Sequence, residues 1–153
     1  MKENYEFMPS RKLKEFFKLI KEQYGKVPDV FEKLAFVKGK DKVYVLSRDV
    51  GEIDLKNLRI NSLGLYIAEV KNTQLRLSIE GAQLIGPSAS KNIVEISDEQ
   101  FKDWFKGADL KVDGDFSGFV ILKHKNDFVG SGKFKDGYVL NFVPKARRLI
   151  EVH

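Results

Sequence analysis

The 153-residue sequence contains no cysteine, only two methionines and only two histidines. The absence of cysteine excludes disulfide bonds, thiolate catalysis and cysteine-ligated zinc. His124 and His153 cannot build a metal site by themselves, and no carboxylate cluster lies near them in the sequence. We therefore expect neither a metal nor a cofactor. No run of residues approaches the ~20 apolar positions needed to cross a bilayer.

The first residues also lack the marks of a targeting segment. Met1–Asn4 are followed neither by an apolar run nor by a small-residue cleavage site, so the sequence predicts a cytoplasmic protein without membrane contact. Hydrophobic residues make up 42% of the chain and include 12 phenylalanines. Such a composition can bury a core, which excludes a disordered chain.

The net charge of +5 is unevenly distributed along the chain. Residues 1–50 carry 12 Lys/Arg against 8 Asp/Glu, residues 51–109 carry 7 against 9, and residues 110–153 carry 8 against 5. Two basic ends around an acidic middle suit a polyanion such as a nucleic acid. A net charge of +5 is nevertheless modest, and many proteins that bind no nucleic acid match it.

The N-terminal half predicts a helix followed by strands. Ser10 can cap a helix that runs to Tyr24 and stops at Gly25. One face of this helix is apolar and consists of Leu13, Phe16, Phe17, Ile20 and Tyr24. A neighbouring stripe consists of Arg11, Lys14, Lys18 and Lys21. This stripe is either a phosphate-facing surface or a solvated face, and Glu15 and Glu22 at pairing distance favour the solvated face.

Further elements follow up to a predicted junction. Pro28 begins a short helical turn, strands are predicted at 43–46 and 65–70, and a short helix at 78–84. The segment 86–90 joins turn formers and small residues, which predicts a linker. We therefore expect an N-terminal mixed α/β lobe at residues 1–86 and a second domain at 87–153.

The C-terminal half changes from helical to β periodicity. Ser97 and Gln100 form a capping-box pattern, and the helix that follows puts Phe101, Trp104 and Phe105 on one face. Strands are then predicted at 119–122, 128–135 and 138–142, with turns at Asn126-Asp127 and Asp136-Gly137. Alternation places Phe128, Gly130, Gly132 and Phe134 on one face, and Ser131, Lys133 and Lys135 on the other. Short strands joined by tight turns predict a small β-barrel.

No catalytic arrangement can be recognised in the sequence. Gly130-Ser131-Gly132-Lys133 lacks the spacing and the following helix of a phosphate-binding loop, so we interpret the glycines as shaping a barrel strand. His124 stands between two lysines, with no neighbouring carboxylate to orient it, and is expected to be solvated. The densest group of cations is Lys145, Arg147 and Arg148, directly after Pro144.

Several of these motifs resemble a known family. They are Gly118-Phe119-Val120, Gly130-x-Gly132-Lys133, Asp136-Gly137, Asn141 and Pro144-Lys145-x-Arg147-Arg148. Together with the run 83–97, they resemble the PUA domain at the C-terminus of Sun-family RNA cytosine-5 methyltransferases, over about residues 80–150. Residues 10–75 are similar to the lobe that precedes this domain there and in Nip-family ribosome-assembly factors. Leu140 departs from the family, which carries a basic residue before the asparagine.

The resemblance implies an α+β protein in which the N-terminal lobe packs on a PUA-like barrel that binds structured RNA, either rRNA or tRNA. The expected RNA-binding residues are Lys91, Lys123, Lys125, Lys133, Lys135, Asn141, Lys145, Arg147 and Arg148. Catalysis is not expected, because the sequence shows no glycine-rich nucleotide loop and no thiol for covalent attack. An alternative is a protein-interaction scaffold or assembly factor. Its partner would be a separate RNA-modifying enzyme, such as a methyltransferase, or a ribosome-assembly protein.

Overall fold

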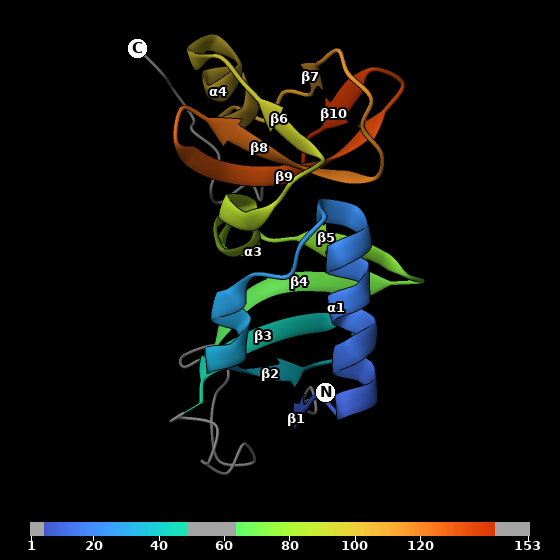
Figure 1. Ribbon diagram of the computed structural model, residues 1–153. Helices are drawn as coiled ribbons and strands as arrows, with labels where there is room; N and C mark the ends of the chain where they lie inside the picture. The colour runs from blue at the N-terminus through green and yellow to red at the C-terminus, as the bar shows by residue number, and fades with distance from the viewer. Residues whose placement is uncertain (1–4, 49–63, 143–153) are drawn as a thin grey trace.

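The computed structural model describes residues 5–48 and 64–142, and shows two five-stranded sheets with helices beside and between them (Figure 1). The first sheet and its helices comprise β1 (Glu6–Phe7), α1 (Ser10–Tyr24), the 3₁₀ turn η1 (Asp29–Lys33), β2 (Leu34–Lys38), β3 (Lys42–Ser47), β4 (Leu65–Lys71), β5 (Gln74–Leu77) and α3 (Ile79–Ile85). The remaining elements are η3 (Gly86–Ser88), β6 (Ile93–Glu95), α4 (Asp98–Phe105), β7 (Leu110–Lys111), β8 (Phe119–His124), β9 (Asp127–Lys135) and β10 (Tyr138–Leu140). The α+β fold class is confirmed.

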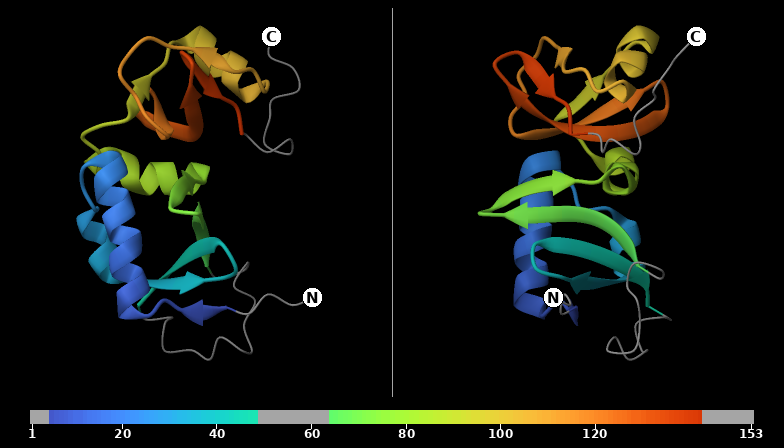
Figure 2. Two further views of the ribbon diagram at one scale, coloured as in Figure 1. Left: turned by 90° about the vertical axis from the view of Figure 1, so that its right-hand side faces the viewer. Right: turned by 180° about the vertical axis from the view of Figure 1, so that it is seen from behind.

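The first sheet is antiparallel, in the order β1-β2-β3-β4-β5, and α1 stands against one of its faces (Figure 2). The predicted helix 10–24 is confirmed, and Gly25 ends it with a left-handed φ of 91°. The predicted cap is wrong. Pro9, in an extended conformation, occupies the N-cap position and Ser10 is already helical, because the Pro9 carbonyl accepts the first helical hydrogen bond from Leu13.

The apolar face of α1 forms the first core, as predicted from its spacing. Phe16, Ile20 and Tyr24 are buried, with Leu13 and Phe17 partly buried beside them. Phe36, on the neighbouring strand β2, completes an aromatic cluster with Phe16 and Phe17 at centroid distances of 6.1 and 5.3 Å. This cluster fixes α1 on the sheet, since aromatic pairs at such distances stabilise each other beyond their burial.

The second sheet has the order β6-β8-β9-β10-β7, and only the β6–β8 pair is parallel. The capping box of α4 is confirmed, with Ser97 and Gln100 exchanging hydrogen bonds of 2.9 and 3.1 Å. The Asp136-Gly137 turn is also confirmed, because both residues have positive φ and join β9 to β10 as a two-residue hairpin.

The predicted barrel is confirmed only in part, because the described strands form an open, curved sheet. The edge strands β6 and β7 are short and are not paired with one another. The chain between them forms α4, whose fully buried Trp104 packs with Val94 and Leu110 of the two edge strands. Helix α4 therefore covers the gap between β6 and β7, which pairing of these two strands would close in a complete barrel.

The predicted alternation along β9 is wrong for Phe128, because the strand contains a β-bulge, whereas Gly130, Gly132 and Phe134 share one face as predicted. Lys123 pairs with Phe128 and Leu122 with Gly130, so Val129 is an extra residue. The bulge turns Phe128 toward the first core, where a Cβ on Gly86 would lie 2.3 Å from its ring, while Phe134 joins the second core. The connecting turn is Lys125-Asn126, one residue earlier than predicted.

Strand β8 belongs to both cores. Its residues Phe119 to Leu122 are all buried, as the sequence predicted for an apolar interior strand. Ile121 packs in the first core, whereas Val120 and Leu122 pack in the second, with Trp104. Helix α3 lies between the two sheets and contacts both β4 and β9 (Figures 1 and 2).

A set of polar contacts locks the end of α1 to the segment before β8; we call Gln23, Tyr24, Asn92, Ser117 and Phe119 the inter-sheet joint. Gln23 Nε2 donates to the carbonyl oxygens of Ser117 and Phe119 at 2.6 and 2.8 Å. Tyr24 Oη donates to the Phe119 carbonyl at 3.0 Å, and burial raises the pKa of Tyr24, which keeps this donor protonated. Asn92 Nδ2 donates to the Gln23 carbonyl at 2.6 Å.

None of the helices in the described residues is long and apolar enough to cross a membrane.

Because β8 is buried on both faces, shortening a side chain on one face should destabilise the core on that side. Ile121→Ala and Leu122→Ala should each reduce the free energy of unfolding by about 2–5 kcal/mol, because each leaves a cavity in a packed core. Hydrogen exchange should separate the two variants. Ile121→Ala should speed exchange in α1 and in β8, whereas Leu122→Ala should speed exchange in α4. Identical exchange patterns would show that β8 does not divide two cores.

Candidate nucleic-acid interface

The described candidate lysines form two groups at opposite ends of the β8–β9 hairpin. Lys123 and Lys125 lie at the end where β8 turns into β9. Lys133 lies opposite Phe119 at the other end, and Lys135 adjoins the second hairpin turn. Lys91 belongs to the second group, because the Asn92 carbonyl beside it accepts from Ile121 N and Asn92 Oδ1 accepts from Ser117 N. Lys145, Arg147 and Arg148 lie outside the described residues.

The first group is partly neutralised by carboxylates. Lys123 Nζ lies 4.0 Å from Glu95 and 5.7 Å from the Phe128 ring, and Lys125 Nζ lies 3.6 Å from Asp98. For Lys91, Lys133 and Lys135 of the second group, no ion pair with another described residue is found. The second group is therefore the better candidate for phosphate contacts, since its charges are not already shared with a carboxylate.

His124 has a carboxylate partner, which corrects the expectation of a solvated ring without one. Its Nε2 lies 2.6 Å from Asp98 Oδ1, and its ring stacks on Phe101 at a centroid distance of 4.4 Å. Only 15% of the side chain is exposed. The hydrogen bond from His124 lowers the pKa of Asp98, and the Lys125 ammonium group lowers it further. The sequence could not show this pairing, because the two residues come from different elements.

Asn141 serves the fold in the described structure. Its Nδ2 donates to the carbonyl oxygens of Trp104 and Ala108 at 2.6 and 2.9 Å, and its backbone N–H donates to Asp109 Oδ1 at 2.7 Å. These bonds hold the end of β10 against the C-terminal end of α4. Both amide hydrogens are thus used within the protein, which favours a structural role for this side chain.

The two strand glycines shape the packing around Trp104. A Cβ on Gly132 would lie 2.6 Å from Trp104 Cη2 and 2.6 Å from the Leu140 carbonyl oxygen, and a Cβ on Gly130 would approach Trp104 Nε1 at 3.5 Å. Gly132 therefore allows the tryptophan ring to approach β9 closely. This agrees with the interpretation of these glycines as shape rather than ligand contact.

Arg76 of β5 is a cation that the sequence analysis did not single out. Its guanidinium carbon lies 4.6 Å from the centre of the Phe142 ring, and its Nη2 donates to the Phe142 carbonyl at 3.4 Å. The Phe142 ring in turn lies 5.6 Å from that of Phe119, which pairs with Lys133. The first sheet therefore places a positive charge at the same end of β8 as the second group of lysines. A lone arginine in a short strand gives no signal in the sequence.

The comparisons with known proteins match the C-terminal part of the chain, in which both groups of lysines lie. Residues 91–149 match the family described as the methyltransferase RsmF PUA domain. The PUA resemblance is thereby confirmed for these residues. The PUA match includes every described lysine of the two groups, and the described part of the chain brings together no set of three His, Asp or Glu able to hold a metal.

The similar curated proteins are ribosomal RNA small subunit methyltransferases F. That of Vibrio cholerae serotype O1 (strain M66-2) is 32% identical over 92 residues, which make up 60% of this chain and 20% of that protein. That of Vibrio atlanticus is 28% identical over 107 residues, 69% of this chain and 23% of that protein. That of Psychromonas ingrahamii is 29% identical over 97 residues, 60% and 20% respectively. The chain spans about a fifth of the length of the curated relatives it matches.

The contact between His124 and Asp98 predicts an acid-sensitive contribution to stability. Because the folded-state pKa of Asp98 is lowered, its ionised form stabilises the fold at neutral pH, and this contribution is lost as the pH falls through the folded-state value. Below about pH 4, where an ordinary aspartate begins to protonate, the free energy of unfolding should fall more steeply for the wild type than for Asp98→Asn. Urea unfolding over a pH series measures this difference. The control Glu99→Gln, which removes the neighbouring charge, should keep the steep fall, and an equally steep fall in Asp98→Asn would contradict the assignment.

Proposed function

We propose that this protein is a non-catalytic RNA-binding protein that recognises structured RNA, either rRNA or tRNA, and acts in RNA modification or ribosome assembly. The observation that carries the proposal is the PUA match at residues 91–149. Lys91, Lys133 and Lys135 lie within it, and none of them forms an ion pair with another described residue. The curated relatives are, by name, methyltransferases of small-subunit ribosomal RNA. The matched fifth of their length supports binding of such RNA by this chain.

The proposed organisation has two lobes, with residues 1–86 forming the N-terminal lobe and residues 87–153 the RNA-binding domain. In support, the first sheet is complete at Leu77, the 3₁₀ turn η3 ends at Ser88, and residues 89–92 carry neither helix nor strand before β6 begins. Asn92 and Gln23 of the inter-sheet joint then hold the two lobes together.

Recognition would rest on phosphates and shape. A-form RNA hides its base edges in a deep, narrow groove, so lysine and arginine contacts to the backbone position the RNA while its shape selects it. We assign the main contacts to Lys91, Lys133 and Lys135, and from the sequence alone to Lys145, Arg147 and Arg148. Lys123 and Lys125 are weaker candidates, because each would have to exchange a carboxylate for a phosphate.

The proposed protein is non-catalytic because cytosine-5 methyl transfer of the resembled family needs a nucleophilic thiol, and the sequence has no cysteine. A separate RNA methyltransferase or a ribosome-assembly protein is the proposed protein partner, and the cytoplasm the proposed location. A pure scaffold would need a large exposed apolar patch. The exposed large hydrophobic residues in the described ranges are Phe7, Val30, Leu65, Tyr138 and Phe142, and the first four come from four different elements.

The C-terminal cations give a direct test of RNA binding. Replacing Lys145, Arg147 and Arg148 together with Ala should weaken binding to different RNA sequences alike, because phosphate contacts do not read bases. The slope of log K against log salt should shrink by about 0.7–0.9 per lost contact, or roughly 2–3 in total. Fluorescence anisotropy with a labelled hairpin RNA over a salt series measures this. As a control, Arg11, Lys14 and Lys21 replaced together with Ala should leave the slope unchanged; a wild-type protein that does not bind the hairpin would refute the proposed function.

The absence of methyl transfer can be tested separately. The purified, nuclease-free protein should incorporate no labelled methyl group from S-adenosylmethionine into total RNA. Incorporation that survives a second purification step would show that the chain is an enzyme, whatever its affinity for RNA.

A further inference from the structure

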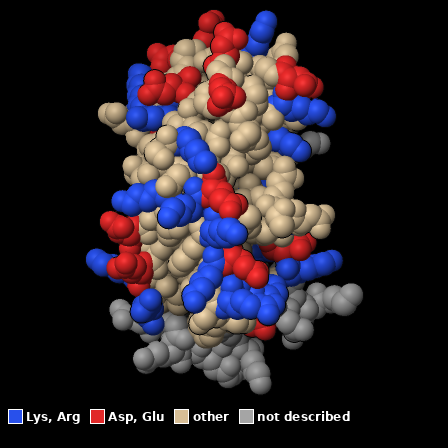
Figure 3. Space-filling model, turned by 45° about the vertical axis from the view of Figure 1, so that its right-hand side comes forward, with Lys and Arg blue, Asp and Glu red and all other residues tan. Residues whose placement is uncertain are grey.

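A groove runs along the side of the N-terminal part, between α1 and the β2–β3 and β4–β5 hairpins. Its volume is about 570 Å³. Its floor is apolar and includes Phe16, Val43 and Val70. Its rim carries more lysines than carboxylates, namely Lys12, Lys18, Lys38, Lys40 and Lys42 against Glu15, Glu22 and Asp41. Figure 3 shows lysine and arginine side chains gathered over the lower half of one face of the molecule, with acidic side chains among them.

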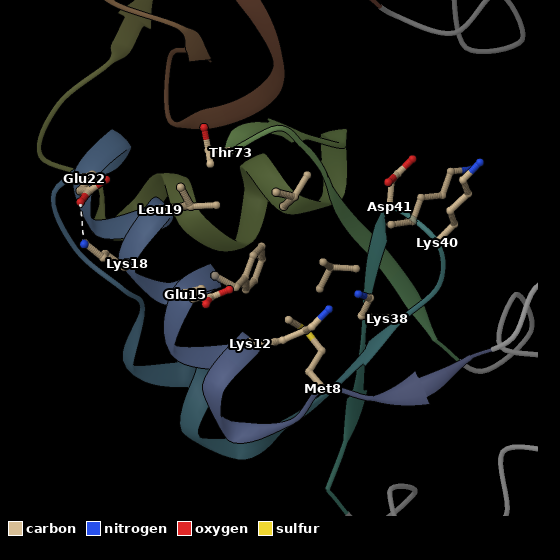
Figure 4. A pocket seen from close by; sticks show the side chains of 14 residues that line it. Met8, Lys12, Glu15, Lys18, Leu19, Glu22, Lys38, Lys40, Asp41 and Thr73 are labelled. Atoms are coloured by element: carbon tan, nitrogen blue, oxygen red, sulfur yellow. Dashed lines mark ion pairs between the residues drawn. The ribbon is translucent and has the colours of Figure 1, made fainter.

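Two of the rim lysines direct their ammonium groups at each other. Lys12 comes from α1 and Lys38 from the end of β2, and in Figure 4 the two side chains meet over the groove. Contact with the Lys12 ammonium group lowers the pKa of Lys38, and burial and repulsion from the same charge lower it further, while the carboxylates of Glu6 and Asp41 partly oppose this shift. The two ammonium groups repel each other, and an anion held between them would be attracted to both.

The remaining rim charges do not cancel this pair. Glu22 is already paired with Lys18 at 3.9 Å, and Lys42 lies over the Tyr66 ring at 5.3 Å. For Lys12, Lys38 and Lys40, no ion pair with another described residue is found. The acidic residues Glu15 and Asp41 also line the groove. The groove lining therefore carries five lysines against three carboxylates, which leaves the groove positive.

The groove continues toward the PUA domain. A second hollow of about 270 Å³ shares its lining residues Leu19, Glu22 and Thr73. The far wall of this second hollow is formed by Gly118 and Phe119, at the inter-sheet joint. Phe119 pairs with Lys133 on β9. The two hollows thus form one concave path from Lys12 and Lys38 to Phe119, the strand partner of Lys133 in the PUA match.

We propose that the groove of Lys12, Lys38 and Lys40 is a second phosphate-binding surface that holds the backbone of the same RNA molecule bound by the PUA domain. This inference rests on the proposed function. Flexible lysine side chains on a concave path suit a sugar–phosphate backbone, which they contact without reading bases. The inter-sheet joint fixes the distance between the two surfaces, so an RNA that reaches both gains contacts without a further loss of protein flexibility.

The test compares two variants of the full chain that lose the same charge. In the groove variant, Lys12, Lys38 and Lys40 are each replaced with Gln; in the control, Arg11, Lys14 and Lys21, which lie on the same helix outside the groove lining, are each replaced with Gln. The probe is a fluorescein-labelled hairpin RNA with a single-stranded extension. The salt slope of the groove variant should fall by roughly 2–3, and its affinity at about 0.1 M salt by on the order of 100-fold, whereas the control should match the wild type.

The outcomes separate this inference from the proposed function. If wild type and groove variant bind with equal slopes while Lys91, Lys133 and Lys135 variants lose binding, the groove proposal is wrong and the PUA proposal stands. If the groove variant and the control lose the same affinity, the loss is an effect of net charge alone, and the groove proposal is wrong. If the wild type does not bind the hairpin, both proposals fail. Should the groove variant not fold, NMR titration of the wild type decides, because the amide signals of Lys12 and Lys38 must shift with RNA.

Discussion

Burial of β8 on both faces is the constraint on which the rest of the structure depends. Ile121 closes the core beneath α1 and α3, while Val120 and Leu122 close the core around Trp104. A strand shared in this way cannot move with one sheet and leave the other, because either displacement would expose buried apolar surface. The two halves of the molecule are therefore held in one relative orientation, and charges from both halves can act on one ligand.

The inter-sheet joint adds direction to this apolar contact. Burial of side chains is not directional, but the bonds from Gln23 to the carbonyl oxygens of Ser117 and Phe119 fix how α1 meets the start of β8. Gly118 between those acceptors has a φ of 65°, and a Cβ there would lie 3.1 Å from the Gln23 amide nitrogen. A glycine is needed at this point both for its backbone conformation and for the close approach of the glutamine.

The features that the sequence predicted are those decided by neighbours in the chain. The α1 face, the capping box of Ser97 and Gln100, and the Asp136-Gly137 hairpin all depend on residues within a few positions of one another. The bulge at Val129 was missed because it depends on where Phe128 packs, against Gly86 far away in the sequence. For the same reason, charge pattern alone could not bring Lys12 next to Lys38 or Asp98 next to His124.

Net charge is a poor guide to where a polyanion would bind this protein, and pairing is a better one. An exposed ion pair adds only ~0–1 kcal/mol to stability, yet a lysine in such a pair has little to gain from a phosphate, since one anion merely replaces another. Lys123 and Lys125 are in this position. For Lys12, Lys38 and Lys133, no ion pair with another described residue is found, so a contact between one of them and an RNA phosphate would release a cation condensed on that phosphate. The positive groove of Lys12, Lys38 and Lys40, rather than the total of +5, is therefore the electrostatic feature on which the proposed second RNA contact rests.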